Sequence, residues 1–398
     1  MSKRLLALFV AAVLLGCLGL FGTAAAPARA ASASFLGVSL SELQVAPVGG
    51  ATIRVADAEI WAIHDAWHAN TVRLQIAQDR LTWASGKCPL TTAGCLGYYR
   101  EIQQVANYAL RLGLTVVIND TTLPAPQFIR DEPMPTHATE VFWKDIAAVY
   151  AGRPRVVFDL FNEPRGLGGT GAAQWRIWRN GGTVQGRPGY LGMQTLLTYV
   201  RSTLKAPNMI WADGLSAAGT LNGIAAHNAT GTVDGAPGSV GNHALSQRGD
   251  TVRGPLVYSI HHPMGKQTTT AWWRDFGYLP ALGFTVMDGE WNNAVDGGQY
   301  CWANAPTTMP AFLSYLARKQ VGLTVWEIGP NVNLTGSSVT WAQSAPFDYH
   351  NTLLADAPAS YETPTTTSGN PAQPWNCSHA NNAGSGQVVM NWFAAQAG

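Results

Sequence analysis

The chain has 398 residues, of which 46% are hydrophobic and only 12% are charged, and its formal net charge at pH 7 is +1. This balance supplies neither the basic field that holds nucleic acid nor an acidic tail. The length allows one large barrel or two to three ordinary domains. Some of the 15 tryptophans, 12 tyrosines and 12 phenylalanines must fill the core, but so many aromatic residues also suggest a stacking surface for a flat ligand.

The first 30 residues have the organisation of a secretory signal peptide. The basic pair Lys3-Arg4 precedes an apolar run from Leu5 to about Phe21, and Ala28-Arg29-Ala30 offers small residues for cleavage. We therefore expect a secreted, extracellular protein with no membrane attachment once the signal is removed. An uncleaved anchor is the alternative, and the apolar run is short for one. Cys17 lies in an imperfect lipoprotein box, but the apolar run continues past it.

Four cysteines remain after residue 30: Cys88, Cys95, Cys301 and Cys377. An even number in an exported chain favours two disulfides, for which three pairings are possible. The economical pairing joins Cys88 to Cys95 and Cys301 to Cys377, which would tie the C-terminal tail to the body. A zinc site is the alternative, but no pair has the short spacing of zinc ligands.

Strand-like apolar runs alternate with segments of helical period through most of the chain, which predicts a parallel sheet or barrel. The expected strands are, in order, Phe35–Leu40, Thr71–Ile76, Thr115–Ile118, a run from Val156 that stops at Pro164, Met209–Ala212, Leu256–Ile260, Phe284–Met287 and Leu323–Trp326. The expected helices are Asp57–His68, Tyr99–Leu112, Thr139–Tyr150, Leu191–Leu204, Ala271–Phe276 and Pro310–Lys319. Eight strands with interleaved helices match a single (β/α)8 barrel of the triosephosphate isomerase type.

The expected organisation is a signal peptide over 1–30, the barrel over 31–362, and a Thr/Pro-containing tail over 363–398 that packs on the barrel. Residues 215–253, rich in Gly, Ala and Asn, read as a loop region. Trp61, Trp67 and Trp143 lie on predicted helix faces, and we expect them in the core.

Polar and ionisable residues gather at the predicted C-terminal ends of the strands, where such a barrel places its chemistry. Glu163 follows the fourth strand and Glu290 the seventh, so the two would face each other across the barrel mouth. Paired carboxylates suit cleavage of a glycosidic bond, because one protonates the leaving oxygen while the other attacks the anomeric carbon or activates water. A salt-bridged structural glutamate is the plainer interpretation of either residue alone.

Five segments in this order resemble glycoside hydrolase family 5, which contains secreted cellulases and mannanases. They are Asn70-Thr71-Val72-Arg73, Phe161-Asn162-Glu163-Pro164, Tyr258-Ser259-Ile260-His261, Asp288-Gly289-Glu290 and Trp326. The resemblance covers about Phe35 to Glu327 and implies a retaining enzyme without metal or organic cofactor. It implies that Glu163 is the general acid/base and Glu290 the nucleophile. It further implies that Arg73 holds Glu290, that Asn162 contacts the sugar 2-hydroxyl, and that His261 and Trp326 line the site.

The chain departs from this family at two places. Residues 118–122 contain no histidine, although the family often has one after the third strand. After the sixth strand, His261-His262-Pro263 lacks the tyrosine that often bonds the nucleophile, and Tyr258 lies on the strand instead. These departures suggest a divergent subfamily.

The sequence therefore predicts a secreted, monomeric endo-β-glycosidase that hydrolyses a β-1,4-linked polysaccharide or oligosaccharide, with a glucan preferred. The alternatives within the family are a β-mannanase, another glycosidase or a transglycosylase. The alternative of another class is a carbohydrate-binding barrel that has lost catalysis. The polysaccharide stays open, because loops set specificity on this fold.

Overall fold

The computed structural model describes residues 35–40, 42–45, 57–65, 67–81, 93–122, 132–225, 242–262, 268–291, 294–295, 300–301, 305–326 and 385–397. All of them belong to one unit, Ala31–Gly398. The predicted signal peptide, Cys88 and Cys377 lie outside the described residues, and the side chains of Cys95 and Cys301 are not described. Signal cleavage, the domain limits and both disulfides stay predictions.

Eight parallel strands of the described region close into a barrel in the order β1-β12-β9-β8-β7-β4-β3-β2. Their bounds are β1 Leu36–Leu40, β2 Thr71–Ala77, β3 Thr115–Thr121, β4 Val156–Asp159, β7 Met209–Asp213, β8 Leu256–Ile260, β9 Thr285–Trp291 and β12 Gly322–Val325. Most residues of these strands are buried, as expected for parallel strands covered on both faces. The predicted (β/α)8 barrel is confirmed, with each expected strand in place.

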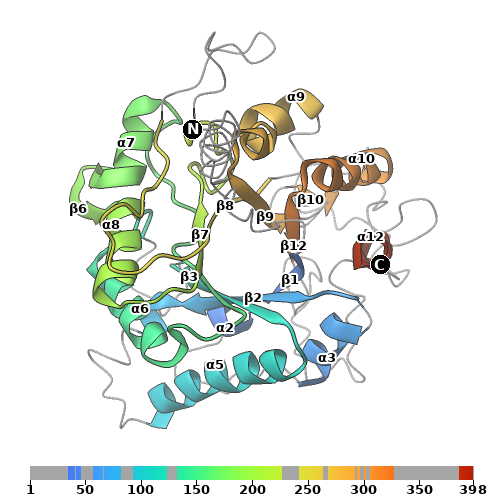
Figure 1. Ribbon diagram of the computed structural model, residues 1–398, viewed down its shortest axis with the longest axis horizontal. Coiled ribbons are helices and arrows are strands. Elements are labelled where there is room, and N and C mark those ends of the chain that lie inside the picture. The colour runs from blue at the N-terminus through green and yellow to red at the C-terminus, as the bar shows by residue number, and fades with distance from the viewer. Residues whose placement is uncertain are drawn as a thin grey trace, which may run out of the picture. The chain divides into compact units, whose positions relative to one another are not determined.

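Helices lie around the strands in Figure 1. The longer ones are α3 Asp57–Asp65, α5 Ala93–Arg111, α6 His137–Tyr150, α7 Ala172–Asn180, α10 Ala305–Lys319 and α12 Ser385–Ala397. The shorter pieces are α2 Glu42–Val45, α8 Met193–Thr198, η2 Tyr199–Thr203, α9 Thr269–Trp272, η3 Trp273–Gly277 and η4 Leu279–Leu282. Helix α6 begins at a capping box. The Thr136 hydroxyl accepts from Ala138 N and the Thr139 hydroxyl accepts from Thr136 N, which pairs backbone N–H groups that the first turn leaves free.

Several elements were not expected from the sequence. Helix α7 and a hairpin of β5 Gly181–Val184 and β6 Arg187–Leu191 fill the segment after β4, so the expected helix from Leu191 begins only at Met193. A short pair, β10 Ala294–Val295 and β11 Tyr300–Cys301, follows β9. Trp67 and Trp143 are buried as predicted, but Trp61 is 51% exposed, so its predicted place in the core is wrong.

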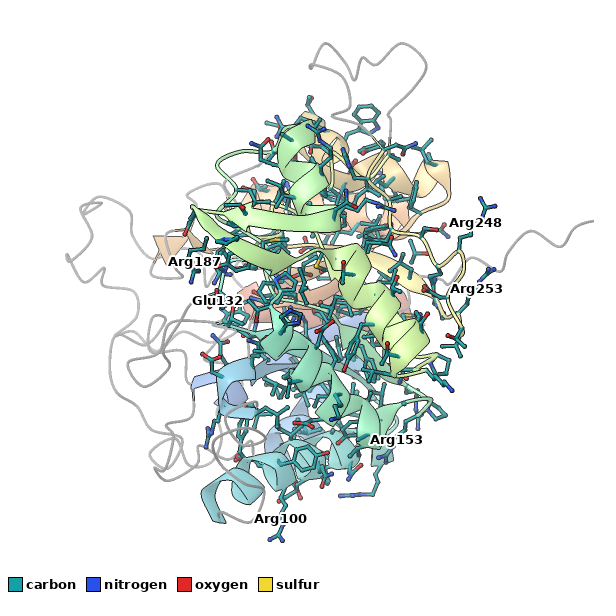
Figure 2. All side chains as sticks on the ribbon, turned by 90° about the vertical axis from the view of Figure 1, so that its left-hand side faces the viewer. Arg100, Glu132, Arg153, Arg187, Arg248 and Arg253 are labelled. Carbon is teal, nitrogen blue, oxygen red and sulfur yellow. The ribbon has the colours of Figure 1, made fainter. Side chains whose placement is uncertain are left out.

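The β5–β6 hairpin packs beside the segments that leave β3 and β4. Its Tyr190 and Arg187 both donate to one oxygen of Glu132, at 2.8 and 3.0 Å. Figure 2 shows Arg187 and Glu132 next to each other at one edge of the molecule. Since both neighbouring segments leave the C-terminal ends of their strands, the hairpin stands at the barrel end that carries the predicted site.

The C-terminal helix packs into the main apolar core through Val389, Met390 and Phe393. The sequence predicted a tail lying on the barrel but no helix within it. No helix among the described residues is long and apolar enough to cross a membrane.

The opposite end of the barrel is tied together by the Asn208 side chain. Its amide nitrogen donates to the carbonyls of Tyr150 and Val156, both at 3.0 Å, and its oxygen accepts from Gly152 N at 2.7 Å. These bonds join the end of α6 and the starts of β4 and β7. These hydrogen bonds should stabilise the fold without affecting catalysis, because the predicted site lies at the other end of the barrel.

We therefore predict that Asn208→Ala destabilises the fold by about 2–4 kcal/mol, because it leaves buried backbone groups unpaired. The folded fraction should keep its kcat. Chemical unfolding and steady-state kinetics measure the two effects. Asn180→Ala is the control, because Asn180 accepts only an exposed bond from Arg179 among the described side chains, and its loss should cost less than about 0.5 kcal/mol. Equal losses in the two variants would contradict the prediction.

Candidate active site

Glu163 lies in the loop that follows β4, with its backbone in the left-handed region at φ 53°. A residue other than glycine pays about 1–3 kcal/mol for this conformation, so neighbouring bonds must hold it. The carboxylate of Asp213, at the end of β7, accepts from Glu163 N at 3.0 Å. Arg165 donates to the Glu163 carbonyl at 3.1 Å. These two bonds turn the Glu163 side chain to the barrel mouth, where 27% of it stays exposed.

Glu290 lies on β9 and is held mainly by β2. Both Arg73 Nη1 and Gln75 Nε2 donate to its Oε1 atom. The strand period of two places Arg73 and Gln75 on one face of β2, toward the barrel interior. The Glu290 side chain is 12% exposed, so it is more enclosed than that of Glu163.

Arg73 is a fully buried cation that binds more than Glu290. Its Nε donates to Asp159 Oδ2 at 2.8 Å and its Nη2 donates to Asn162 Oδ1 at 2.9 Å. Burial lowers the pKa of Arg73, but the carboxylates of Asp159 and Glu290 raise it more, so the net shift is upward. The guanidinium therefore stays charged and fixes groups from β4, its following loop and β9.

His261 follows β8 and lies between the two glutamates. Its Nδ1 is 3.0 Å from Glu163 Oε1 and 3.6 Å from Glu290 Oε2, while its Nε2 is 3.3 Å from Asp213 Oδ2. Burial lowers the pKa of His261, but Asp213, Glu290 and the bond to Glu163 raise it further, to about 10. At neutral pH it is therefore an imidazolium that bridges the carboxylates.

One oxygen each of Glu163 and Glu290 and one nitrogen of His261 lie within 4.8 Å of one another. Three such side chains could in principle share a divalent cation. Arg73 and Gln75 already donate to Glu290, however, and His261 would have to lose a proton that it holds up to about pH 10. The donors present suit a pair of hydrogen-bonded carboxylates better than a metal centre.

Burial raises the pKa of Glu290, and the charges of His261 and Arg73 pull it back down. Glu163 and Asp213 add to the upward shift. The ionised form of Glu290 therefore depends on the two cations beside it.

The structure brings together Glu163, Glu290, Arg73, Asn162 and His261, which the sequence predicted to meet. Trp326 follows β12 and is half-buried, and its backbone N–H donates to the backbone carbonyl of Trp291, the residue after Glu290. Tyr258 does not replace the missing tyrosine. It is 2% exposed and its hydroxyl accepts from Leu245 N, within the main apolar core.

Sequence reasoning missed two residues that touch the glutamates, Gln75 and Asp213. Asp213 is the last residue of β7, but the predicted strand stopped one residue earlier. Gln75 lies two positions after Arg73 and so shares its face of β2. The strand-end position and the strand period were the signals that could have found them.

The sequence profile described as Cellulase (glycosyl hydrolase family 5) matches residues 37–332. The chain belongs to glycosyl hydrolase family 5. It is therefore a glycoside hydrolase, and the resemblance drawn from its motifs is confirmed.

Solved structures share the fold of this family 5 chain at low sequence identity. A cellulase from an Icelandic hot spring isolate is 15% identical, with 91% of this chain and 87% of that chain covered and a TM-score of 0.53. An endocellulase of Pyrococcus horikoshii, a variant in complex with cellotetraose, is 16% identical, with coverages of 80% and 91% and a TM-score of 0.52.

A Thermobifida fusca endoglucanase catalytic domain, also a variant in complex with cellotetraose, is 15% identical, with coverages of 90% and 91% and a TM-score of 0.52. No curated protein sequence matches the chain. The low identities agree with a divergent member of the family.

We predict that His261→Gln moves the acid limb of kcat/KM to higher pH. The substitution removes a positive charge that favours ionised Glu290, so the pKa of Glu290 rises and less of it is ionised at a given pH. In the unsubstituted protein the acid limb should lie above the range of an ordinary glutamate. Profiles between about pH 4 and pH 9 measure the shift. An acid limb that stays in place would show that His261 does not set the charge of Glu290.

We also predict that Gly289→Ala displaces the site. A Cβ there would lie 2.3 Å from Ser259 Oγ and 3.2 Å from His261 Nε2. We expect a loss of about 10- to 100-fold in kcat/KM, because small misplacements of reacting groups are costly. Adding Ser259→Ala removes the closest atom and should restore part of the activity.

Gly97→Ala is the control for this pair, because no atom of the described residues lies within 4 Å of a Cβ at that glycine. Full activity in Gly289→Ala, or no recovery in the double variant, would contradict the steric account.

Proposed function

We propose that the protein is a secreted endo-β-glycosidase that hydrolyses a β-1,4-linked glucan with retention of configuration. The observation that carries the proposal is the pairing of Glu163 and Glu290 across the barrel mouth, where one carboxylate oxygen of each lies within 4.8 Å of the other. Retaining glycosidases hold their two carboxyl groups about 5–5.5 Å apart, whereas inverting enzymes need about 6.5–9.5 Å to admit a water. The spacing supports direct attack by one glutamate.

The surroundings of the two glutamates support different roles. Glu290 accepts from a charged guanidinium and an amide, which favours the ionised form that a nucleophile needs. Glu163 is the more exposed of the two, so it is the one that can exchange protons with a leaving group and with water. We assign Glu290 as the nucleophile and Glu163 as the general acid/base.

The reaction then has two steps. Glu290 attacks the anomeric carbon, the glycosidic bond breaks, and the leaving oxygen takes the proton of Glu163. Water next attacks the same carbon, gives a proton to Glu163 and releases the Glu290 carboxylate. Asn162, oriented by Arg73, is placed to bond the sugar 2-hydroxyl, and Trp326 offers a flat face for a sugar ring.

The glucan preference is supported by the cellotetraose complexes of two structures with the same fold. Export is supported by the basic pair, apolar run and small residues of the first 30 positions.

We predict that Glu290→Gln lowers kcat by about a thousandfold or more while the fold is kept, because no anion is left to attack. Glu163→Gln should lose most activity on cello-oligosaccharides but less on an aryl cellobioside whose leaving group needs no proton. Added azide should restore turnover in the Glu163 variant.

A panel of β-glucan, β-mannan and xyloglucan, scored by the release of reducing ends, identifies the substrate.

Glu140→Gln is the control, since Glu140 lies on α6 and pairs with His137 on the surface. Retained hydrolysis by Glu290→Gln would exclude it as the nucleophile. Binding of cello-oligosaccharides without turnover by the unsubstituted protein would favour a carbohydrate-binding barrel, and longer products at high substrate would favour a transglycosylase.

A further inference from the structure

Gln75 is a buried amide in direct contact with the carboxylate of Glu290. It lies on β2, pairs in register with Asn119 of β3, and is only 1% exposed. Its Nε2 donates to Glu290 Oε1. The amide can only take this orientation, because turning its oxygen to the carboxylate would set two acceptors against each other.

The two oxygens of Glu290 have different surroundings. Oε1 accepts from both Gln75 and Arg73. Oε2 faces the other side of the site, 3.6 Å from His261 Nδ1, and His261 in turn contacts Glu163. A carboxylate held by two donors on one oxygen cannot rotate freely, so one defined oxygen points to the space between the glutamates.

We propose that Gln75 is a positioning residue that fixes Glu290 so that Oε2 is the attacking oxygen. This inference rests on the proposed retaining mechanism. The new bond forms between Oε2 and the anomeric carbon as the glycosidic bond breaks and Glu163 gives its proton to the leaving oxygen. Oε1 then becomes the carbonyl oxygen of the ester and keeps its bond from Gln75. When water attacks and the Oε2–carbon bond breaks, the same donor receives the released carboxylate.

Arg73 alone would fix the Glu290 carboxylate less firmly, because its guanidinium also binds other acceptors. It also donates to Asp159 and Asn162, so its position is set by three acceptors at once. The amide nitrogen of Gln75 donates to Glu290 alone among the described residues. The chain lacks the strand-six tyrosine of its family, and Gln75 supplies from β2 a neutral donor to the same carboxylate.

The test compares Gln75→Met, which keeps the size of the side chain but removes the donor, with Gln75→Glu, which keeps its shape but places a carboxylate beside Glu290. Gln78→Met is the matched control, because Gln78 is a buried glutamine three positions on whose oxygen accepts from Thr139 at 2.6 Å. The readouts are the pH profile of kcat/KM on an aryl cellobioside and the rate at which a 2-fluoro aryl cellobioside labels Glu290. Labelling isolates the first step, because the trapped ester hydrolyses slowly.

We expect Gln75→Met to slow labelling by about 10- to 100-fold, the usual cost of losing a hydrogen bond to a charged group. Its acid limb should move to higher pH, and that of Gln75→Glu should move further, since a like charge is added. The control should label at nearly the normal rate. If Gln75→Met does not fold, as judged by circular dichroism, the acid limb of Gln75→Glu is still compared with that of the unsubstituted protein and should lie at higher pH.

The role of Gln75 would be overturned if both variants label at a rate within about twofold of the unsubstituted protein and their acid limbs lie within about 0.2 pH of its own. That result differs from failure of the proposed function, in which the unsubstituted protein itself would not be labelled on Glu290 or Glu290→Gln would keep its activity.

Discussion

The site depends on one buried cation. Arg73 has no exposure to solvent, and a guanidinium in such a place is tolerated only when its donors are paired. Asp159, Asn162 and Glu290 provide that pairing from β4, the loop after it and β9. Since each partner belongs to a different part of the barrel, the arginine can be satisfied only when the barrel has closed. Folding and assembly of the site are in this sense the same event.

A second cation, His261, organises the side of the site that faces solvent. It contacts Glu163 and Asp213 and lies near Glu290, so three carboxyl groups gather around one imidazolium. Asp213 also holds the backbone of Glu163 in its left-handed conformation. The two cations act on different sides of the site, because Arg73 binds Glu290 from within the barrel while His261 lies between Glu163 and Glu290 at its mouth.

Much of this could be predicted from the sequence, because the barrel strands are short apolar runs and the polar candidates lie on them or at their ends. Glu163 and Glu290 were predicted to follow strands and Arg73 to lie on one, and the resemblance to family 5 gave them their roles. Asp213 was missed because the strand was ended one residue early, and Gln75 because an amide within an apolar strand carries no charge to mark it. The β5–β6 hairpin was missed because Gly-rich segments give a weak periodic signal, and α7 because it is only nine residues long between two such segments. Trp61 was misplaced because an aromatic residue at helical spacing can also face solvent.

The departures from the family pattern change the residues around Glu163 and Glu290 and leave the two glutamates themselves in place. The end of β3 offers Asn119 and Thr121, whose side chains are hydrogen-bonded at 2.5 Å, near the place where the family often has a histidine. The loss of the tyrosine after β8 leaves Gln75 and Arg73 as the donors to Glu290 within the described region. A constellation of two carboxylates and one buried arginine can thus stay in place while its neutral partners change.

The most direct measurement of the central claim is the configuration of the first sugar product, followed by proton NMR as a cello-oligosaccharide is cleaved. Attack by Glu290 followed by water inverts the anomeric carbon twice, so the β-anomer should appear first and the α-anomer only later, as the sugar mutarotates. Immediate appearance of the α-anomer would mean a single displacement by water and would contradict the account of Glu290 as a nucleophile held by Arg73 and Gln75.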